Sequence, residues 1–414
     1  MRNGLAYVAT LVALSGCSSE QKSDASGGAG GTSTAMGGAM AQAGASTTTM
    51  GGAPAQGGAA TGGSAVSRGG TTAQGGASLA GGSAGKASSA GAGNGVCGAL
   101  SGQLFDGSHP WNQKVSTTPL DAESAAIIQY LNTNHTASAR FQIDGPSDEP
   151  NSPYGIVVLQ ATASTPRRAF TPTSEFYEPD CDPAPALLPA GGAIEGESGY
   201  ACEGDGDCHL IVLDAANCRL YEMWRANLSG STFYGGCQAV WDLRQTYTPT
   251  LRGDCCTSAD AAGLPIAAHL FNADEIAAGE IKHAIRFILP NEHMRSRVYV
   301  RPATHSTSAT SGPATAPPYG ARLRLKAAFD DSRLSAGAKV VARALKEYGM
   351  ILSDGGNVTF TAESDRFTTA KWPQVQLGAR DLTSLRWTDF EVVELGTRYT
   401  FNSACDCSRT PISQ

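Results

Sequence analysis

A turn built from small residues places one carboxyl group in apolar surroundings. Asp260 stands among Ala, Gly, Leu and Pro within residues 257–265. A carboxyl group in a tight, partly buried turn has a raised pKa and can serve as a general acid. The alternative is structural, because Asp also caps the turn that follows it. Glu280 is a second candidate, since glycoside hydrolysis needs two carboxyl groups across a cleft, but it also fits the end of a short helix.

Two histidines and one arginine are further candidates in the same stretch. His283 and His305 are candidate bases, and Arg286 is a candidate substrate-binding residue. In strand geometry His283 shares a face with Ile285 and Phe287, while Arg286 lies on the other face. His283 therefore also fits a core histidine, and His305 also fits an exposed residue of a Ser/Thr-rich loop.

Residues 319–327 alternate between apolar and cationic side chains. Arg322, Arg324 and Lys326 fall on one face, where they could bind an anionic sugar or a phosphate. With a uronate as ligand, an arginine would neutralise the carboxylate and His305 or Tyr299 would take the proton, which is lyase chemistry. The alternative is a solvated strand face whose cations pair with carboxylates on neighbouring strands.

Two more features could hold a ligand. Trp241 is a candidate platform for sugar stacking and equally a candidate core residue. Glu203, Asp205 and Asp207 alternate within a Gly-containing loop, an arrangement that suits calcium. The spacing lacks the full EF-hand pattern, so a solvated turn inside a small disulfide loop is the alternative, and no other metal or cofactor is predicted.

The pattern of short β-branched and aromatic segments predicts a mainly β domain. We expect a β-sandwich or jelly roll with a few peripheral helices. Segments 209–213 and 218–224 flank a turn and predict a hairpin. Helices are predicted from Pro119 with Thr118 as cap, and from Ser335 to Gly349. The other predicted elements are strands at 155–161, 283–289, 297–300, 319–327 and 390–393, and a short helix at 274–278.

Ten cysteines follow position 96, and this even number predicts up to five disulfides that staple the domain. Such pairing requires an oxidising compartment. Cys255 and Cys256 are adjacent, so each is expected to bond elsewhere. Cys405 and Cys407 are expected to attach the tail to the body of the domain.

The N-terminal segment predicts export and lipidation. A charged start precedes an apolar run of signal-peptide length, which ends in Leu-Ser-Gly-Cys17. This segment resembles the lipobox of bacterial lipoproteins, which implies a signal peptide at 1–16 and a lipid on Cys17 as the membrane anchor. Ser18 after the cysteine implies the outer membrane. Residues 17–96 are rich in Gly, Ala and Ser and predict a disordered stalk, leaving 97–414 as one secreted domain.

Composition and missing motifs narrow the classes of function. The net charge is −7 and no basic tract occurs, so nucleic acid is not an expected partner. The GxSxG, HExxH and P-loop patterns are absent. No later segment is apolar enough for a transmembrane helix.

Three patterns resemble an uncharacterised group of secreted actinobacterial and myxobacterial proteins. They are Ser-Ala-Asp-Ala-Ala-Gly-Leu-Pro at 258–265, His-Ala-Ile-Arg-Phe at 283–287 and Gly-Ala-Arg-Leu-Arg-Leu-Lys-Ala at 320–327. The likeness spans about residues 205 to 395. It implies secretion and carries no catalytic residues over.

Two functions remain open from the sequence. The first is a surface lipoprotein whose domain binds or cleaves extracellular carbohydrate, and the second is a non-catalytic structural or adhesion protein of the cell envelope. An enzyme should gather its candidate residues around one cleft, whereas an adhesin should scatter them and expose a flat apolar patch.

Overall fold

Strands dominate the regular structure of this computed structural model, which describes residues 103–135, 141–204, 206–357 and 359–414. All of these residues belong to one compact unit. The predicted signal peptide (1–16), lipid site (Cys17) and stalk (17–96) lie outside the described residues.

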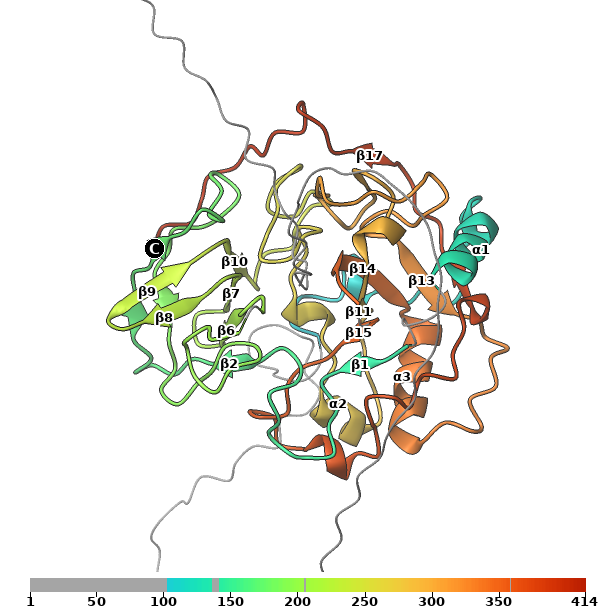
Figure 1. Cartoon of the computed structure of the whole chain (residues 1–414), viewed down its shortest axis with the longest axis horizontal. Helices are drawn as coiled ribbons and strands as arrows, with labels where there is room; N and C mark the ends of the chain where they lie inside the picture. Colours follow the sequence, from blue (N-terminus) through green and yellow to red (C-terminus); the bar gives the residue numbers. More distant parts are fainter. Residues whose placement is uncertain (1–102, 136–140, 205, 358) are drawn as a thin grey trace, which may run out of the picture. The chain divides into compact units, whose positions relative to one another are not determined.

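The larger sheet has six strands in the order β1-β15-β11-β14-β13-β16 (Figure 1). Its centre pairs β11 with β14 in parallel, and β13 runs antiparallel to both β14 and β16. Both central strands are largely buried, as expected for strands covered on two faces. The bounds are β1 Ile143–Asp144, β11 Ile285–Leu289, β13 Arg322–Leu325, β14 Met350–Gly355, β15 Phe360–Thr361 and β16 Phe390–Val392.

The second sheet has four strands in the order β10-β7-β6-β2. The predicted hairpin is confirmed, because β6 and β7 pair antiparallel from Leu210↔Met223 to Asp214↔Arg219. The edge strand β2 runs parallel to β6. The bounds are β2 Val158–Gln160, β6 Leu210–Asp214, β7 Arg219–Met223 and β10 Gln238–Asp242.

Three small sheets complete the strand pairing of the described residues. They are β12 Val298–Tyr299 with β17 Tyr399–Thr400, β3 Arg167–Arg168 with β5 Ala186–Leu187, and β4 Thr171–Pro172 with β9 Thr232–Gly235 and β8 Asn227–Ser229.

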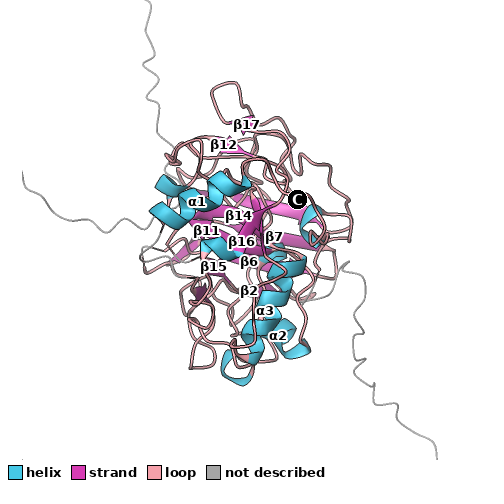
Figure 2. Ribbon diagram, turned by 90° about the vertical axis from the view of Figure 1, so that its right-hand side faces the viewer, coloured by secondary structure: helices cyan, strands magenta, loops and turns pink. Residues whose placement is uncertain are grey.

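The three α-helices of the described residues are α1 Ser124–Asn134, α2 Ala273–Ala278 and α3 Ala336–Glu347. Figure 2 shows α2 and α3 close to each other and α1 elsewhere. The predicted Ser335 cap of α3 is confirmed, since its Oγ accepts a hydrogen bond from the Ala338 amide. The predicted start of the first helix at Pro119 is wrong, because Leu120 instead forms a β-bridge with Val393 and α1 begins at Ser124.

One hydrophobic core joins the two main sheets. It contains Leu213 and Trp241 of the four-stranded sheet together with Phe287 and Leu323 of the six-stranded sheet. A second, smaller core packs the other face of β6 and β7 against the loops around β5. The hairpin of β6 and β7 therefore packs against a hydrophobic core on each of its two faces.

The mainly β, disulfide-stapled prediction is confirmed. A β-sandwich or jelly roll is not confirmed, because both main sheets contain parallel pairs and a jelly roll is antiparallel. Among the described residues, no helix is long and apolar enough to cross a membrane.

Candidate functional site

A cavity of about 220 Å³ lies beside the loop that carries Asp260. One wall is formed by residues 255–261 and another by the C-terminal arm, which we define as residues 399–414 and which contributes Phe401 and Asp406. At roughly 30 Å³ per molecule, this volume corresponds to about seven waters.

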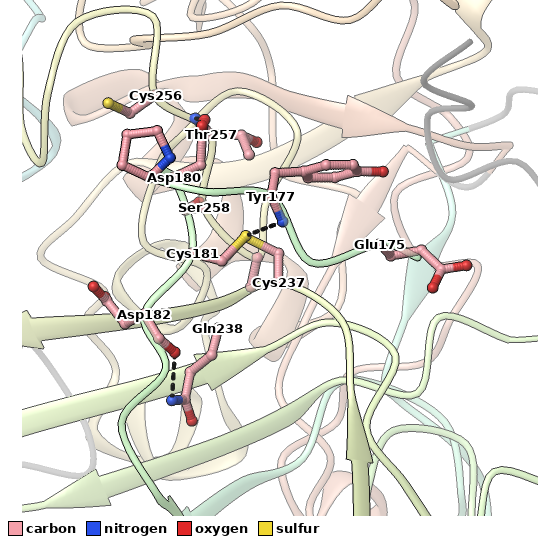
Figure 3. Close-up of a disulfide and its surroundings, with 12 residues drawn as sticks. Glu175, Tyr177, Asp180, Cys181, Asp182, Cys237, Gln238, Cys256, Thr257 and Ser258 are labelled. Carbon is pink, nitrogen blue, oxygen red and sulfur yellow. Dashed lines mark hydrogen bonds between the residues drawn. A yellow bond between two sulfur atoms is a disulfide. The ribbon is translucent and has the colours of Figure 1, made fainter. Parts of the chain in front are cut away.

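Disulfides bring the walls of the cavity together. Cys255 bonds Cys405 and Cys256 bonds Cys407. The two adjacent cysteines therefore bond elsewhere and the tail is attached to the body, as predicted, while the partners themselves were not predicted. A third disulfide, Cys181–Cys237, fixes the segment that carries Tyr177 and Asp180 to the four-stranded sheet. Figure 3 shows this disulfide with Tyr177, Asp180, Thr257 and Ser258 around it.

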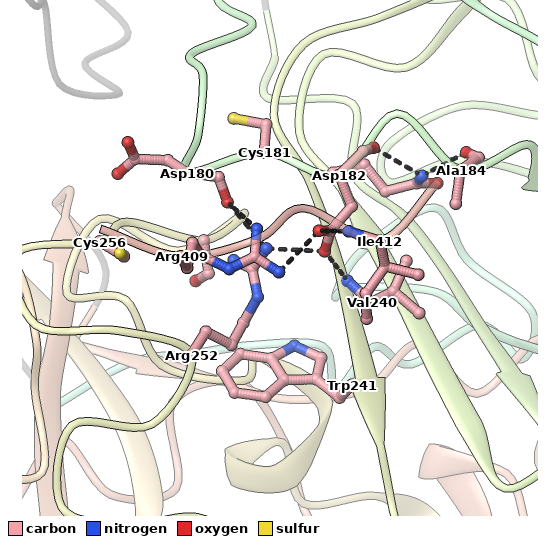
Figure 4. A network of polar contacts seen from close by, with 12 residues as sticks. Asp180, Cys181, Asp182, Ala184, Val240, Trp241, Arg252, Cys256, Arg409 and Ile412 are labelled. Atoms are coloured by element: carbon pink, nitrogen blue, oxygen red, sulfur yellow. Dashed lines mark hydrogen bonds and ion pairs between the residues drawn. The ribbon is translucent and has the colours of Figure 1, made fainter. Parts of the chain in front are cut away.

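The arm is also held by a buried ionic contact (Figure 4). Asp182 is fully buried and accepts hydrogen bonds at 2.7 Å from Arg252, Arg409 and the Ile412 amide. It also accepts one at 2.8 Å from the Val240 amide. Because all four donors converge on one carboxylate, its charge is compensated and the arm cannot swing away without exposing it.

Asp260 sits in a tight turn whose backbone requires glycine. The Gly263 amide donates to the Asp260 carbonyl at 2.9 Å, and Gly263 has φ +75°. A Cβ at Gly263 would lie 2.2 Å from Thr304 Oγ1 and 2.6 Å from the Cys256 carbonyl oxygen. Only glycine therefore fits this close approach.

The Asp260 side chain points into a buried network and does not cap the turn, so the capping alternative is wrong. Arg286 of β11 donates to Oδ1 from Nε at 3.2 Å and from Nη2 at 3.0 Å. Ser353 Oγ of β14 lies 2.7 Å from both carboxylate oxygens. Two strands of the six-stranded sheet thus position the loop that walls the cavity.

Arg286 bridges two buried carboxyl groups. Its Nη2 also donates to Asp354 Oδ2 at 2.9 Å. Burial raises the pKa of Asp354 to about 7, and the nearby Asp260 charge adds to this shift. Burial likewise raises the pKa of Asp260, against the opposing effects of Arg286 and Ser353. Arg286 is therefore used within the protein and is not available to a ligand.

His305 and Thr307 line the same cavity. The His305 Nδ1 donates to the Ala261 carbonyl at 2.9 Å, which leaves Nε2 with the lone pair. Burial lowers the pKa of His305 to about 4, so the ring is neutral near pH 7. Thr307 is 7% exposed, and its Oγ1 has no hydrogen-bond partner among the described residues.

Two carboxyl groups on different walls line the cavity with different environments. Asp180 accepts the Thr257 amide at 2.7 Å, and burial raises its pKa. Asp406 lies on the C-terminal arm between two disulfide-bonded cysteines and is exposed. Burial thus favours the protonated form of Asp180, whereas the Asp406 side chain is open to solvent.

Aromatic rings form the apolar part of the lining. They come from Tyr177, Trp224 and Phe401. Trp224 is held by a 3.0 Å hydrogen bond from its Nε1 to Asp207, and Phe401 packs edge-on against His305 with 4.5 Å between ring centroids. Aromatic faces beside a few polar groups are typical of sites for sugars and other amphipathic ligands.

A second buried pair supports the cavity loop from behind. His209 Nδ1 lies 2.6 Å from Glu195, and its Nε2 lies 3.3 Å from the Ala259 carbonyl. Burial alone would lower the pKa of His209, but the Glu195 charge and hydrogen bond outweigh it and raise the pKa to about 9. The protonated ring donates from both nitrogens and so ties Glu195 to the loop.

None of the predicted substrate-binding residues lines the cavity. Arg286 does not, and neither do Trp241, Arg322, Arg324 and Lys326. Trp241 is fully buried and donates from Nε1 to Glu222 at 2.9 Å, so it cannot stack on a sugar. Arg322 is buried and donates to the carbonyls of Tyr348, Pro110 and Gln113. These three carbonyl groups replace the ligand that the sequence suggested.

The other two cations on this strand face, Arg324 and Lys326, have different surroundings. Arg324 pairs at 2.7 Å with Glu391, its register partner on β16, as the alternative interpretation expected. Lys326 is exposed and donates to the Thr388 carbonyl.

Glu280 and His283 do not line the cavity with Asp260 and His305. Glu280 is exposed and pairs with Lys282 at 3.0 Å. His283 is buried, and its Nε2 lies 3.3 Å from Glu275. Burial opposes protonation of His283, but the Glu275 charge outweighs it and raises the pKa.

The calcium prediction is only partly within the described residues, since Asp205 lies outside them. Cys202 and Cys208 form the predicted small disulfide loop. Asp207 accepts the Trp224 indole N–H. Among the described residues, the two groups with metal-ligand proximity each contain disulfide-bonded cysteines, whose sulfurs are not thiolate ligands.

Sequence reasoning missed Asp180, Asp406 and the Glu195–His209 pair. A usable signal was present for two of them, because Asp180 precedes Cys181 and Asp406 lies between Cys405 and Cys407. Polar residues next to disulfide-bonded cysteines are placed firmly by the crosslink. The Glu195–His209 pair follows from tertiary packing and had no such local signal.

The comparisons with known proteins give no relative for this chain. No family model matches it, and no curated protein or solved structure matches it.

Proposed function

We propose that this chain is an envelope lipoprotein, anchored through Cys17 to the outer membrane, whose domain binds and hydrolyses an extracellular carbohydrate in the Asp260 cavity. The observation that carries the proposal is the lining itself. Aromatic rings of Trp224 and Phe401 share one cavity with carboxyl groups of Asp180 and Asp406.

The two carboxyl groups have complementary roles in the proposed reaction. Asp180, with its raised pKa, gives its proton to the glycosidic oxygen as the C–O bond breaks. Asp406, exposed and on the C-terminal arm, accepts a proton from the water that attacks the anomeric carbon, so this water supplies the hydroxyl group of the product. Asp260 and Arg286 act as positioning residues, because they hold the loop through β11 and β14.

Glu280 and His283 lie away from the cavity, which is the scattering expected of an adhesin. The adhesion alternative nevertheless lacks its second expected feature. It expects a broad apolar face, and the large exposed hydrophobic residues of the described chain are Leu120, Tyr154 and Phe367 alone. Three side chains are fewer than a stable docking surface requires.

The test uses the exported, oxidised full chain with Cys17→Ser, which removes the proposed lipid. A panel of neutral, acidic and amino polysaccharides is assayed for retention of the protein and for release of reducing ends. Asp180→Asn should lower product release by about 10²-fold or more while retention persists, since the proton donor is lost and the ring platforms remain. Asp148→Asn is the matched control, because Asp148 is an exposed carboxylate that does not line the cavity.

Two outcomes count against the proposal. Retention without products from any polymer would make the domain a binding module. Neither retention nor products across the panel would remove carbohydrate altogether and favour adhesion.

A further inference from the structure

The charge of the cavity lining selects among carbohydrates. Two carboxyl groups, those of Asp180 and Asp406, are on its lining residues and outside the buried Arg286 network, and within the described residues no lysine or arginine lines it. The one histidine, His305, donates from Nδ1 to a backbone carbonyl and presents a neutral lone pair on its other nitrogen. The polar groups offered to a ligand are therefore mainly acceptors.

The arginines nearest to this lining already have partners. Arg252 and Arg409 donate to Asp182 at 2.7 Å each, and both also donate to the Asp180 carbonyl (Figure 4). Arg301 pairs with Asp254 at 2.9 Å and lies over the Tyr399 ring. A sugar carboxylate or sulfate entering the cavity would meet carboxylates without a free cation to compensate it, which is costly.

The aromatic part of the lining offers an apolar surface for a sugar. It comes from Tyr177, Trp224 and Phe401, and the Arg225 guanidinium, which donates to the Gly206 carbonyl, already lies over the Trp224 ring at 5.3 Å from its centroid.

Resting on the proposed function, we infer that the cavity takes an amino sugar with a free ammonium group, as in a de-N-acetylated polysaccharide. The carboxylate of Asp406 on the arm pairs with the ammonium, and the aromatic rings hold the apolar face of the sugar. N-acetylation removes this charge, and a uronate reverses it.

The experiment compares three oligosaccharides of equal length at about pH 6, where the amine is protonated. They are an oligomer of glucosamine, an oligomer of N-acetylglucosamine and an oligouronate, and binding to the oxidised full chain with Cys17→Ser is measured by calorimetry. The glucosamine oligomer should bind about tenfold more tightly than its N-acetylated counterpart, and the oligouronate should bind most weakly.

Variants test which residue sets the preference. Asp406→Asn should reduce the tenfold ratio to less than about threefold, whereas Asp148→Asn should leave it unchanged. Asp406 is exposed, so this variant is expected to fold, and equal thermal midpoints would verify that.

The outcomes separate the two proposals. Equal or tighter binding of the N-acetylated oligomer or the oligouronate overturns the charge preference and leaves the carbohydrate proposal in place. Binding of none of the three overturns both. A ratio that persists in Asp406→Asn overturns the assignment of the ammonium to that carboxylate.

Discussion

At the scale of single residues, Arg286 is the most constrained side chain of the site. It is 3% exposed, and its guanidinium contacts Asp260, Asp354 and Thr361. Burial alone would lower the pKa of Arg286, but the two carboxylates outweigh it and raise the pKa. Removing this cation would leave two carboxyl groups facing each other in a nonpolar interior.

Arg286→Leu should therefore lower the free energy of unfolding by about 3–5 kcal/mol, measured by urea denaturation at pH 7. Arg333→Leu, at an exposed position, is the matched control and should change it by less than about 0.5 kcal/mol. Adding Asp260→Asn to Arg286→Leu should recover part of the loss, because one buried charge is removed. No loss in Arg286→Leu would contradict the network described above.

The sequence revealed the candidate residues unevenly at this scale. Asp260 was recognisable because small apolar neighbours indicate a buried turn, but its partner Ser353 lies 93 positions away. The Arg322 stripe suggested an anion site because alternation shows which residues share a face and not what covers that face. The carbonyls that cover Arg322 come from Pro110 and Gln113, more than 200 positions away.

At the scale of elements, local signals decided what could be predicted. The 210–223 hairpin and α3 were predicted because each carries its own turn or cap. The start of α1 was not, because the segment at Leu120 pairs with Val393, and that partner is distant in sequence. Parallel pairs such as β11 with β14 also depend on distant residues, so the sandwich prediction had no local basis.

The cap of α3 gives a prediction for this scale. Ser335 Oγ accepts the Ala338 amide at 3.3 Å and donates to Asp381 at 2.6 Å. Ser335→Ala removes the acceptor of the Ala338 amide and one of the donors to Asp381, which keeps the Gly378 amide, and should lower the free energy of unfolding by about 1 kcal/mol. Ser384→Ala, at an exposed position, should have no measurable effect in the same denaturation assay. Equal losses in both variants would count against the cap.

At the scale of the whole molecule, the pH dependence of stability reflects the buried histidines. The folded pKa of His209 is raised to about 9, above its unfolded value near 6.5. Its contribution is therefore full below pH 6.5 and is lost as the pH rises through 9. His283 contributes in the same direction, since its pKa is also raised. His135, His269 and His305 have lowered pKa values and are neutral in both states above pH 7.5.

The free energy of unfolding should consequently fall by about 2 kcal/mol between pH 7 and pH 9, measured by urea denaturation. Glu195→Gln removes the charge that holds the proton on His209 and should flatten this decline. Asp148→Asn should retain the full decline. A decline of equal size in Glu195→Gln would assign the pH dependence to other groups.

The pairing of Cys255 with Cys405 and of Cys256 with Cys407 joins parts of the chain 150 and 151 residues apart. Because the chain is synthesised from its N-terminus, the loop is made long before the arm that completes the cavity. Cys255 and Cys256 could pair with Cys405 and Cys407 in two ways, and only one of these is the pairing in the structure. Docking of Arg409 and Ile412 on Asp182 provides a noncovalent template that favours one of them. Formation of these two disulfides therefore depends on correct docking of the arm, and the cavity is complete only in a chain that has both.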